Sequence, residues 1–418
     1  MKQPGLLILG NGGAAIHAVS AARSAGYEGE INQVSDMEGP AFNPMLSPYY
    51  LKGIIPWDRC FPFGADFYFK HDVTCHFGSA VEKLDPVSKK VLLKNGRNIS
   101  YDNCLIATGA RALVPPVPGL NESGRIFTLR TAQSAKRLEE IISSAKKIVV
   151  LGASLVALKV TEILRKRGVD VILVVRSGHI LRRSAHPVSA VLLQDYFSKQ
   201  GVDIRLECSL KGLDSYGRGV TCRFPDSIIE EGDFVAVCTG VEPSVEFLEP
   251  GQIEMDEAIL VDEKMKASVE GLYAAGDVCQ GLNLMTGKRE LLGLWGNACY
   301  QGRIAGLNMA GVVDAVHHGT IPQHVSPFFD WKYGQLGDVH RHGENVRILS
   351  GGDPEKEGFY LFVFDDGVLV GVNLINRFQG AGRLKSAIFR KVDFSDLVRG
   401  GFCPSYDEII DRISFICI

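Results

Sequence analysis

The chain has 418 residues, too many for one compact core, and it fits two or three domains of ordinary size. Hydrophobic residues make up 46%, charged residues 22% and glycine 46 positions, which is typical of a globular α/β protein with many tight turns and excludes a largely disordered chain. The formal net charge of -3 gives no reason to expect nucleic acid or an anionic membrane as a partner.

The N-terminal apolar run, GLLILG, is short and reads as a buried first strand. It lacks the cationic start and the small-residue cleavage site of a signal peptide. No apolar segment of the sequence approaches the roughly 20 residues that are needed to cross a bilayer. We therefore expect a cytoplasmic protein without a membrane partner.

Residues 5–35 read as strand, glycine turn, helix and strand, which is a βαβ opening. The turn carries Gly10 and Gly12, with Ala15 in the third position of a G-x-G-x-x-A pattern. Asp36 follows the second strand at about the 20-residue distance expected for an acid that holds a ribose hydroxyl. The pattern and its place favour dinucleotide binding over an incidental turn.

A hairpin is predicted next around Asn95-Gly96, followed by a strand that ends in the Ala-Thr-Gly of 107–109. The Pro-rich segment 112–119 reads as a linker. Residues 146–176 then repeat the strand, turn, helix and strand plan, so the sequence predicts two nucleotide-binding domains.

A second linker is predicted at 240–251, and the strand at 269–278 ends on Gly276-Asp277. From about Ile321 the pattern changes to alternating, aromatic-bearing strands without a glycine fingerprint, which predicts a separate α+β domain. Aromatic and basic patches there are explained by a docking face, by a homodimer seam or by ordinary core packing.

Two pairs of histidines are candidates either for metal binding or for surface turns. His340 and His342 form an H-x-H pattern without a third ligand in the sequence, so we expect no metal there. His317 and His318 read as a surface turn.

Four elements in this order carry a resemblance to a known family: the first glycine turn, Y-D-x-x-x-x-A-T-G at Tyr101–Gly109, the second turn, and A-A-G-D at Ala274–Asp277. Over roughly residues 5–311 the chain resembles the FAD-dependent pyridine nucleotide-disulfide oxidoreductase superfamily. Residues 294–311 are similar to its ferredoxin, rubredoxin and nitrite reductase branch. They are also similar to FAD subunits of anaerobic complexes such as phenylglyoxylate dehydrogenase and tungsten aldehyde oxidoreductase.

The resemblance implies an α/β fold with two Rossmann-like domains, one for FAD and one for NAD(P), and a C-terminal α+β interface domain. The implied segments are 1–115 and 244–322 for FAD, 116–243 for NAD(P) and 323–418 for the interface. Carried over by position, it implies cofactor-binding roles for Gly10, Gly12, Ala15, Asp36, Pro44, Val81, Thr108, Gly109, Arg130, Gly152, Ser154, Arg176, Arg182, Gly240, Gly276, Asp277 and Trp295.

The cysteines that disulfide reductases of this superfamily use beside the flavin are missing. The matching region, 39–53, holds no cysteine, and Cys60 lies several residues further on. The ten cysteines include no C-x-x-C pair and no cluster for zinc or iron and sulfur. Electrons must therefore leave the flavin toward a group outside this chain, and the resemblance implies that this partner is an iron–sulfur protein or subunit. We expect a homodimer or a place in a hetero-oligomeric complex.

Two residues beside the expected flavin depart from the family pattern. Where relatives carry a lysine near the flavin, this chain has Pro48, and the glutamate of the second Rossmann helix is replaced by Lys159. We hypothesise that Lys159 supplies from the opposite wall the cation that Pro48 cannot, and so favours hydride arrival at the flavin. The alternative is a lysine that snorkels to solvent.

The second glycine turn keeps Gly152 but has Ser154 and Ala157 in place of the other two glycines. Serine has a Cβ, yet its hydroxyl can donate to a phosphate. After the following strand, arginines stand where NAD sites usually carry an acid, and Arg176 and Arg182 suit the 2′-phosphate of NADP. A solvated basic turn is the alternative, and some relatives bind NAD without the acid.

The sequence thus predicts an FAD-dependent NAD(P)H oxidoreductase that exchanges electrons with an iron–sulfur partner without a redox-active disulfide. One alternative is an NADH oxidase or peroxidase. The other is a non-catalytic, flavin-bearing structural subunit whose nicotinamide site has decayed.

Overall fold

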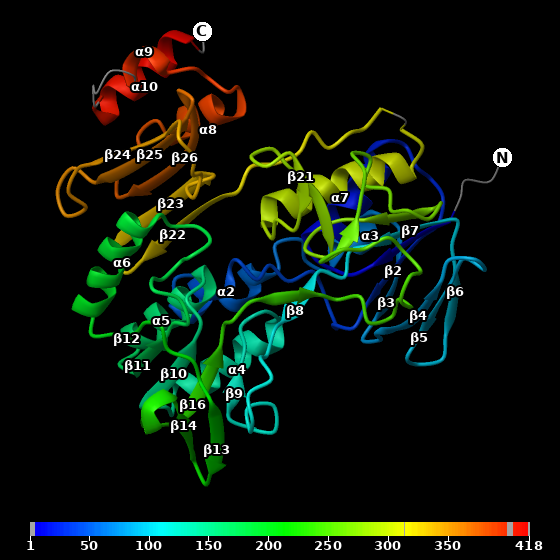
Figure 1. The fold of residues 1–418 in the computed structure, drawn as a ribbon. Helices are drawn as coiled ribbons and strands as arrows, with labels where there is room; N and C mark the ends of the chain where they lie inside the picture. The colour runs from blue at the N-terminus through cyan, green and yellow to red at the C-terminus, as the bar shows by residue number, and fades with distance from the viewer. Residues whose placement is uncertain (1–4, 313, 399–403, 417–418) are drawn as a thin grey trace. The chain divides into compact units, whose positions relative to one another are not determined.

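A computed structural model of the chain describes residues 5–312, 314–398 and 404–416 (Figure 1). Contacts divide the chain into two compact units. The first unit comprises Met1–Arg111, Arg130–Ala132 and Val241–Thr320, and the second comprises Ala112–Leu129, Gln133–Gly240 and Ile321–Ile418. Each unit is therefore assembled from three separate stretches of sequence.

A five-stranded parallel sheet forms the centre of the first unit. Its strand order is β19 (Leu272–Ala274), β7 (Asn103–Ile106), β1 (Leu6–Leu9), β2 (Ile31–Ser35) and β3 (Val73–Phe77). The four residues of β1 are all buried, as expected for a parallel strand that is covered on both faces. The predicted βαβ opening is confirmed, because α1 (Gly13–Ser24) connects β1 to β2.

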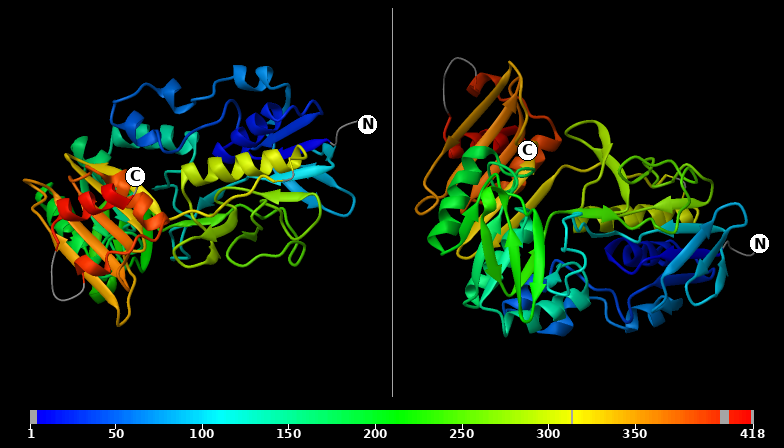
Figure 2. Two further views of the ribbon diagram at one scale, coloured as in Figure 1. Left: turned by 90° about the horizontal axis from the view of Figure 1, so that it is seen from above. Right: turned by 60° about the horizontal axis from the view of Figure 1, so that its bottom comes forward.

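Helix α7 (Trp295–Met309) lies against α1 in the first unit (Figure 2). A Cβ on Gly302 would overlap the carbonyl of Ala14, and one on Gly306 would overlap the carbonyl of Ala18. Two glycines one turn apart therefore let the two helix backbones approach closely.

The remaining elements of the first unit surround this core. The predicted hairpin is confirmed: β5 (Lys90–Leu93) and β6 (Asn98–Ser100) are antiparallel, and Gly96 has a φ of +83°. The other elements are α2 (Ser47–Leu51), η1 (Trp57–Cys60), α3 (Asp66–Lys70), β4 (Val81–Asp85), β8 (Ala110–Ala112), β17 (Val241–Pro243), β18 (Ile259–Leu260), β20 (Cys279–Asn283) and β21 (Lys288–Glu290).

The second unit contains another five-stranded parallel sheet, in the order β12 (Asp203–Arg205), β11 (Asp170–Val174), β10 (Lys147–Leu151), β16 (Phe234–Val237) and β9 (Ile126–Phe127). Helix α5 (Leu155–Lys166) connects β10 to β11, which confirms the second predicted βαβ element. The other elements are α4 (Ala132–Ile142), α6 (Pro187–Lys199), η2 (Pro225–Ser227) and the antiparallel strands β13 (Gly212–Tyr216), β14 (Gly219–Arg223) and β15 (Ile229–Gly232).

The C-terminal residues fold into an antiparallel sheet in the same compact unit. Its order is β22 (Gln323–Phe328), β23 (Trp331–Gly337), β26 (Val368–Ile375), β25 (Phe359–Asp365) and β24 (Val346–Gly351). Helices α8 (Ala381–Phe389) and α10 (Tyr406–Ile416) lie over one face of the sheet, with α9 (Ser395–Val398) between them in sequence (Figures 1 and 2). Phe362 stacks on Tyr406 at this face. The predicted α+β pattern of these residues is confirmed.

Candidate nucleotide-binding sites

The first glycine turn leaves an open helix start at the carboxyl end of β1. Gly10 has a φ of +123°, and a Cβ there would overlap the carbonyl of Ala107. A Cβ on Gly12 would meet nothing within 4 Å. Among the described residues no side chain caps α1, and its first turn holds no acid. The first backbone N–H groups of α1 are therefore available to an anion.

Two elements that are distant in sequence meet this turn. A Cβ on Gly13 would lie 3.2 Å from the ring of Trp295, at the start of α7. A Cβ on Gly276 would lie 3.5 Å from the Cβ of Ala14. Ala15, the third position of the pattern, is fully buried. Predicted residues from the turn, from 276–277 and from α7 are thus close together.

Arg130 and Asp277 form an ion pair at the same place. The Arg130 Nη2 to Asp277 Oδ2 distance is 2.5 Å, and 29% and 16% of the two side chains remain exposed. Arg130 Nε also donates to the carbonyl of Ala110 at 3.0 Å. A Cβ on Gly109 would lie 3.9 Å from Arg130 Nη2, and Thr108 Oγ1 donates to the carbonyl of Ser244 at 2.7 Å. The A-T-G turn, the arginine and the aspartate therefore form one cluster.

A hydrogen-bond network that the sequence did not reveal holds the first turn in place. The Asn11 side chain donates to the carbonyl of Gly39 at 3.1 Å and accepts from the Tyr68 hydroxyl at 2.7 Å. The amide of Gln33, a fully buried residue, donates to Asn11 Oδ1 and to the carbonyl of Gly10, both at 3.0 Å. Burial raises the pKa of Tyr68 to about 12, so its hydroxyl keeps its proton. The one available signal was a glutamine inside an apolar strand.

The other residues predicted for the flavin lie around this cluster in the first unit. Asp36 is exposed directly beyond the end of β2, whose Val34 carbonyl accepts from the amide of Gly10 at 2.8 Å. Pro44 and Pro48 are partly exposed before and within α2, and Val81 begins β4. Their roles stay predictions.

The second glycine turn repeats the backbone geometry of the first. Gly152 has a φ of +110°, and a Cβ there would overlap the carbonyl of Cys238. The stretch Cys238-Thr239-Gly240 thus stands to Gly152 as Ala107-Thr108-Gly109 stands to Gly10. The sequence holds this second copy as VAVCTG, which ends on Gly240, a residue for which the resemblance implies a cofactor-binding role.

The second turn differs from the first at its helix start. Ser154 is the N-cap of α5, and its hydroxyl accepts from the amide of Ala157 at 3.3 Å. The same hydroxyl donates to the carbonyl of Cys238 at 3.3 Å. One of the backbone groups that an anion would use is therefore already bonded within the protein.

The segment 176–186, here called the arginine loop, follows β11. Val175 is buried, whereas Arg176, Arg182 and Arg183 are exposed. The amide of Leu181 donates to the carbonyl of Ala153 in the second glycine turn at 2.9 Å. The arginines predicted to recognise the nucleotide are therefore carried by a loop that is bonded to the glycine turn itself.

Lys159 contacts groups of its own unit. Its ammonium donates to the carbonyl of Pro327, lies 3.8 Å from Glu162 Oε2 and lies 4.8 Å from the centre of the Phe328 ring. Only 12% of the side chain is exposed, so the alternative of a lysine that snorkels to solvent is wrong. The hypothesis that Lys159 supplies charge to the flavin stays a prediction.

The cysteines and histidines set limits on other chemistry. Cys60, Cys104, Cys222 and Cys238 are buried, whereas Cys299 is partly exposed. His317 is only 2% exposed, so its assignment to a surface turn was wrong. Its Nδ1 accepts from the amide of Gly319 at 3.2 Å, and its Nε2 lies 3.1 Å from Asn297 Oδ1, so both ring nitrogens have partners in the buried site. Within the described ranges, no group of three or more His, Cys, Asp or Glu side chains is arranged to hold a metal ion.

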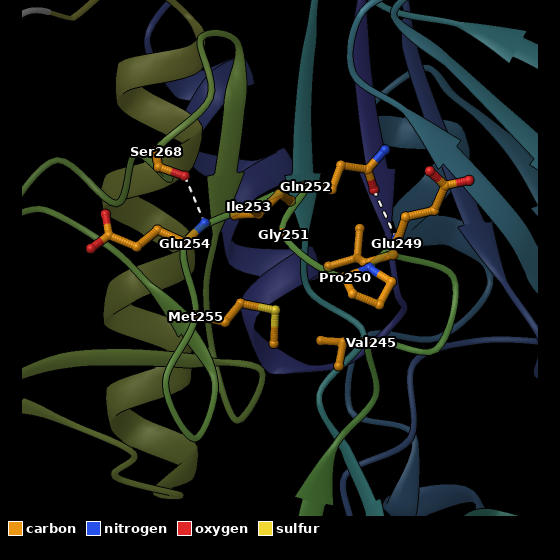
Figure 3. Close-up of a pocket in the computed structure, with 10 residues that line it drawn as sticks. Val245, Glu249, Pro250, Gly251, Gln252, Ile253, Glu254, Met255 and Ser268 are labelled. Atoms are coloured by element: carbon orange, nitrogen blue, oxygen red, sulfur yellow. Dashed lines mark hydrogen bonds between the residues drawn. The ribbon is translucent and has the colours of Figure 1, made fainter.

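An open pocket of 660 Å³ lies in the first unit along residues 245–255 (Figure 3). Hydrogen bonds from the amide of Glu249 to Gln252 and from the amide of Glu254 to Ser268 shape its wall. None of the predicted site residues, all of which are described, lines it. Because two glutamates and no basic side chain are among its described lining residues, it does not suit a phosphate.

No helix in the described parts of the chain has the length and apolar character that a membrane span requires.

Comparison with known proteins agrees with this geometry. The chain is 30% identical over 396 residues to the NADH-dependent phenylglyoxylate dehydrogenase subunit epsilon of Aromatoleum evansii, covering 94% of this chain and 93% of the relative. The crystal structure of the covalent putidaredoxin reductase–putidaredoxin complex has the same fold, with a TM-score of 0.90, 21% identity and coverage of 100% and 99%. An engineered water-forming NADPH oxidase bound to NADPH has a TM-score of 0.88 at 22% identity, with coverage of 99% and 98%.

The family model described as pyridine nucleotide-disulphide oxidoreductase matches residues 4–302. That span contains both glycine turns, the Arg130–Asp277 pair and the start of α7. The chain therefore belongs to the pyridine nucleotide-disulphide oxidoreductase family, and it is a flavin-dependent NAD(P)H oxidoreductase of the ferredoxin reductase type.

Proposed function

We propose that this chain passes electrons between a nicotinamide nucleotide and an iron–sulfur protein or subunit through bound FAD, without a redox-active disulfide. The observation that carries the proposal is the pair of glycine turns of matching geometry, combined with a segment 39–53 that holds no cysteine. Two turns would provide two nucleotide sites. Without a thiol beside the flavin, the electrons would pass to an acceptor outside the chain.

The residues of the first unit fit FAD. The uncapped start of α1 offers backbone N–H groups to a pyrophosphate, and Gly12 leaves space above them. Asp277 keeps an exposed edge beside Arg130 and would accept hydrogen bonds from the hydroxyls of the ribityl chain. Asp36 would accept from the adenosine ribose. Bound FAD supplies the conversion between hydride transfer and single-electron steps.

The arginine loop supports NADPH as the nucleotide. The engineered NADPH oxidase carries five substitutions: a glycine and an aspartate are each replaced by alanine, and arginine, serine and a second arginine are introduced. This chain has Ala157, Val175, Arg176, Ser177 and Arg182, in the same order and at the same spacing. A small apolar residue at Val175 removes the carboxylate that would repel a 2′-phosphate, and the arginines offer it charged donors.

Electron balance calls for a partner outside the chain. A hydride brings two electrons to the flavin, and the matching region of this chain holds no thiol that could take them. Cys60, the next cysteine along the chain, is fully buried and so not accessible to a substrate. Among similar proteins, one was crystallised with putidaredoxin and another is a subunit of an NADH-dependent dehydrogenase. Because each of these similar proteins occurs together with another protein chain, they support an electron carrier on a separate chain.

An anaerobic titration of the purified protein tests the proposal. We expect NADPH to bleach the flavin absorbance near 450 nm, and an oxidised ferredoxin added afterwards to restore it. A flavin that neither NADPH nor NADH bleaches would overturn the nicotinamide site and favour the structural-subunit alternative. Rapid oxygen consumption by the isolated chain would favour the oxidase alternative instead. Protein that is purified colourless and takes up no FAD would overturn the proposal altogether.

A further inference from the structure

The C-terminal sheet supplies two buried side chains to the backbone of the arginine loop. The hydroxyl of Tyr333, in β23, donates to the carbonyl of Ser184 at 2.5 Å. The amide nitrogen of Asn373, in β26, donates to the same carbonyl at 3.1 Å and to the Tyr333 hydroxyl at 2.9 Å. Asn373 Oδ1 accepts from the amide of His186 at 2.9 Å. Both side chains are fully buried.

These contacts form a closed set of hydrogen bonds. The Tyr333 hydroxyl donates once and accepts once, and the Asn373 amide uses both its nitrogen and its oxygen. Burial raises the pKa of Tyr333, so the hydroxyl stays protonated and remains a donor. Buried polar groups in a fully satisfied network hold their partners in one arrangement, because any other arrangement leaves a donor or acceptor unpaired.

The network fixes one end of the arginine loop, and other bonds fix the rest. The amide of Leu181 is held by the second glycine turn, and the amide of Ile180 donates to Gln194 of α6 at 3.0 Å. Arg182 and Arg183 lie between these anchors and the carbonyl of Ser184, with their own side chains exposed. A short loop pinned on both sides of two arginines fixes the backbone from which those two side chains extend.

The loop also faces charged groups of the C-terminal sheet region. Burial is the main reason that the pKa of His340 lies below its usual range, while the neighbouring Asp338 raises it and His179 and the guanidinium of Arg182 lower it further. Arg182 is therefore within electrostatic range of His340. His340 is thus a further residue of the C-terminal part of the chain near the arginine loop, beside the hydrogen bonds at Ser184 and His186.

From this geometry we infer that Tyr333 and Asn373 are positioning residues for nucleotide specificity: they hold the arginine loop so that Arg182 meets the 2′-phosphate of NADPH. The inference rests on the proposed function, in which that loop recognises NADPH. The C-terminal sheet would then contribute to nucleotide selectivity, although neither Tyr333 nor Asn373 contacts the nucleotide. Pre-organised cations lose less conformational freedom on binding, so a loosened loop weakens recognition of the phosphate and leaves the rest of the nucleotide site intact.

The test compares apparent affinities for NADPH and NADH, measured by anaerobic flavin reduction, in four proteins. Asn373→Leu keeps the side-chain size and removes both bonds of Asn373 to the loop, leaving the Tyr333 bond to Ser184, and we expect NADPH affinity to fall about tenfold while NADH affinity changes less than twofold. Tyr333→Phe removes one hydroxyl, and we expect it to lower the affinity for NADPH about threefold and to leave the affinity for NADH unchanged. Tyr406→Phe is the matched control, because that buried hydroxyl also donates to a backbone carbonyl at 2.5 Å, of Gln379, away from the loop. It should change neither affinity.

A double variant separates positioning from general damage. If Asn373 acts through Arg182, then Arg182→Ala alone should abolish the preference for NADPH, and Asn373→Leu added to it should remove no further selectivity. Equal losses for NADPH and NADH in Asn373→Leu and Tyr333→Phe would overturn the inference, as would an unchanged ratio in both. A wild-type flavin that neither nucleotide reduces would instead overturn the proposed function. A wild type that reacts with both nucleotides but does not prefer NADPH would overturn the inference and leave the oxidoreductase proposal standing.

Discussion

Replacing Lys159 with methionine should destabilise the second unit, because a buried carboxylate depends on that ammonium. Glu162 is fully buried on α5, where Oε1 accepts from the amide of Phe329 at 2.9 Å and lies 3.5 Å from Lys166 Nζ. Lys159 Nζ lies 3.8 Å from Oε2. At an effective dielectric constant of about 20, that separation corresponds to about 4 kcal/mol of attraction before desolvation is subtracted.

The net loss is smaller than the attraction. The variant no longer has to desolvate the Lys159 ammonium on folding, and Lys166 still neutralises part of the Glu162 charge. We therefore expect the free energy of unfolding to fall by about 2 kcal/mol. Lys166→Met is the matched control, since 44% of that side chain is exposed and solvent screens its interaction. It should cost less than half as much. Adding Glu162→Gln to Lys159→Met should restore most of the stability, because the unpaired charge is then gone.

Urea unfolding followed by circular dichroism measures these differences. Equal losses in Lys159→Met and Lys166→Met, or a double variant no more stable than Lys159→Met, would refute the electrostatic reasoning. The same variant tests the flavin hypothesis independently. If Lys159 also stabilises reduced flavin, the anaerobic rate of reduction by NADPH should fall at least fivefold in a protein that is still folded. An unchanged rate would leave Lys159 with its structural role alone.

Three further predictions follow from the described contacts. Asp277→Asn removes the charge that pairs with Arg130 at 2.5 Å, and we expect about tenfold weaker FAD retention, or about 1.4 kcal/mol, measured by flavin release on dialysis; undiminished retention would contradict the assignment. Burial lowers the pKa of His317 and of His324 to about 4, while an unfolded imidazole titrates near 6.5, so the unfolded state binds more protons as the pH falls. The free energy of unfolding should therefore fall by about 2 kcal/mol per histidine between pH 7.5 and 5. Urea midpoints that are equal at pH 7.5 and 5 would exclude this. Ser154→Gly frees a backbone N–H of α5 and should tighten NADPH binding about threefold, seen in the flavin titration; weaker binding would show that the hydroxyl itself contacts the nucleotide.

The sequence predicted the parts of the fold that local patterns determine. Both βαβ elements could be placed because an uninterrupted apolar strand, a glycine turn and an amphipathic helix follow one another within about 30 residues. Gly10 and Gly152 could be identified from the same patterns, since each position requires a conformation that only glycine adopts easily. The domain boundaries at 115, 243 and 322 stay a prediction.

The contacts that the sequence did not reveal join residues that are far apart in the chain. Tyr333 and Asn373 stand in strands with apolar neighbours, and each bonds to Ser184, about 150 to 190 residues away. The Gln33 and Tyr68 contacts to Asn11 are similarly non-local. A single sequence shows that such residues are polar and predicts burial of their neighbours, but it does not say which backbone group they satisfy. The surface assignment of His317 failed for the same reason.

The two turns have the same backbone geometry and different helix starts, which matches two different demands on binding. At the first turn, glycine stands at the N-cap of α1, and a bound phosphate would displace no protein hydrogen bond there among the described residues. At the second turn, a phosphate competes with Ser154 for the amide of Ala157. A cofactor that stays through many turnovers benefits from the first arrangement, whereas a nucleotide that must leave after each hydride transfer benefits from the second. The absence of the two later glycines at the second turn therefore suits an exchangeable nucleotide, and under the proposed function its selectivity would come from the arginine loop and the side chains that hold that loop.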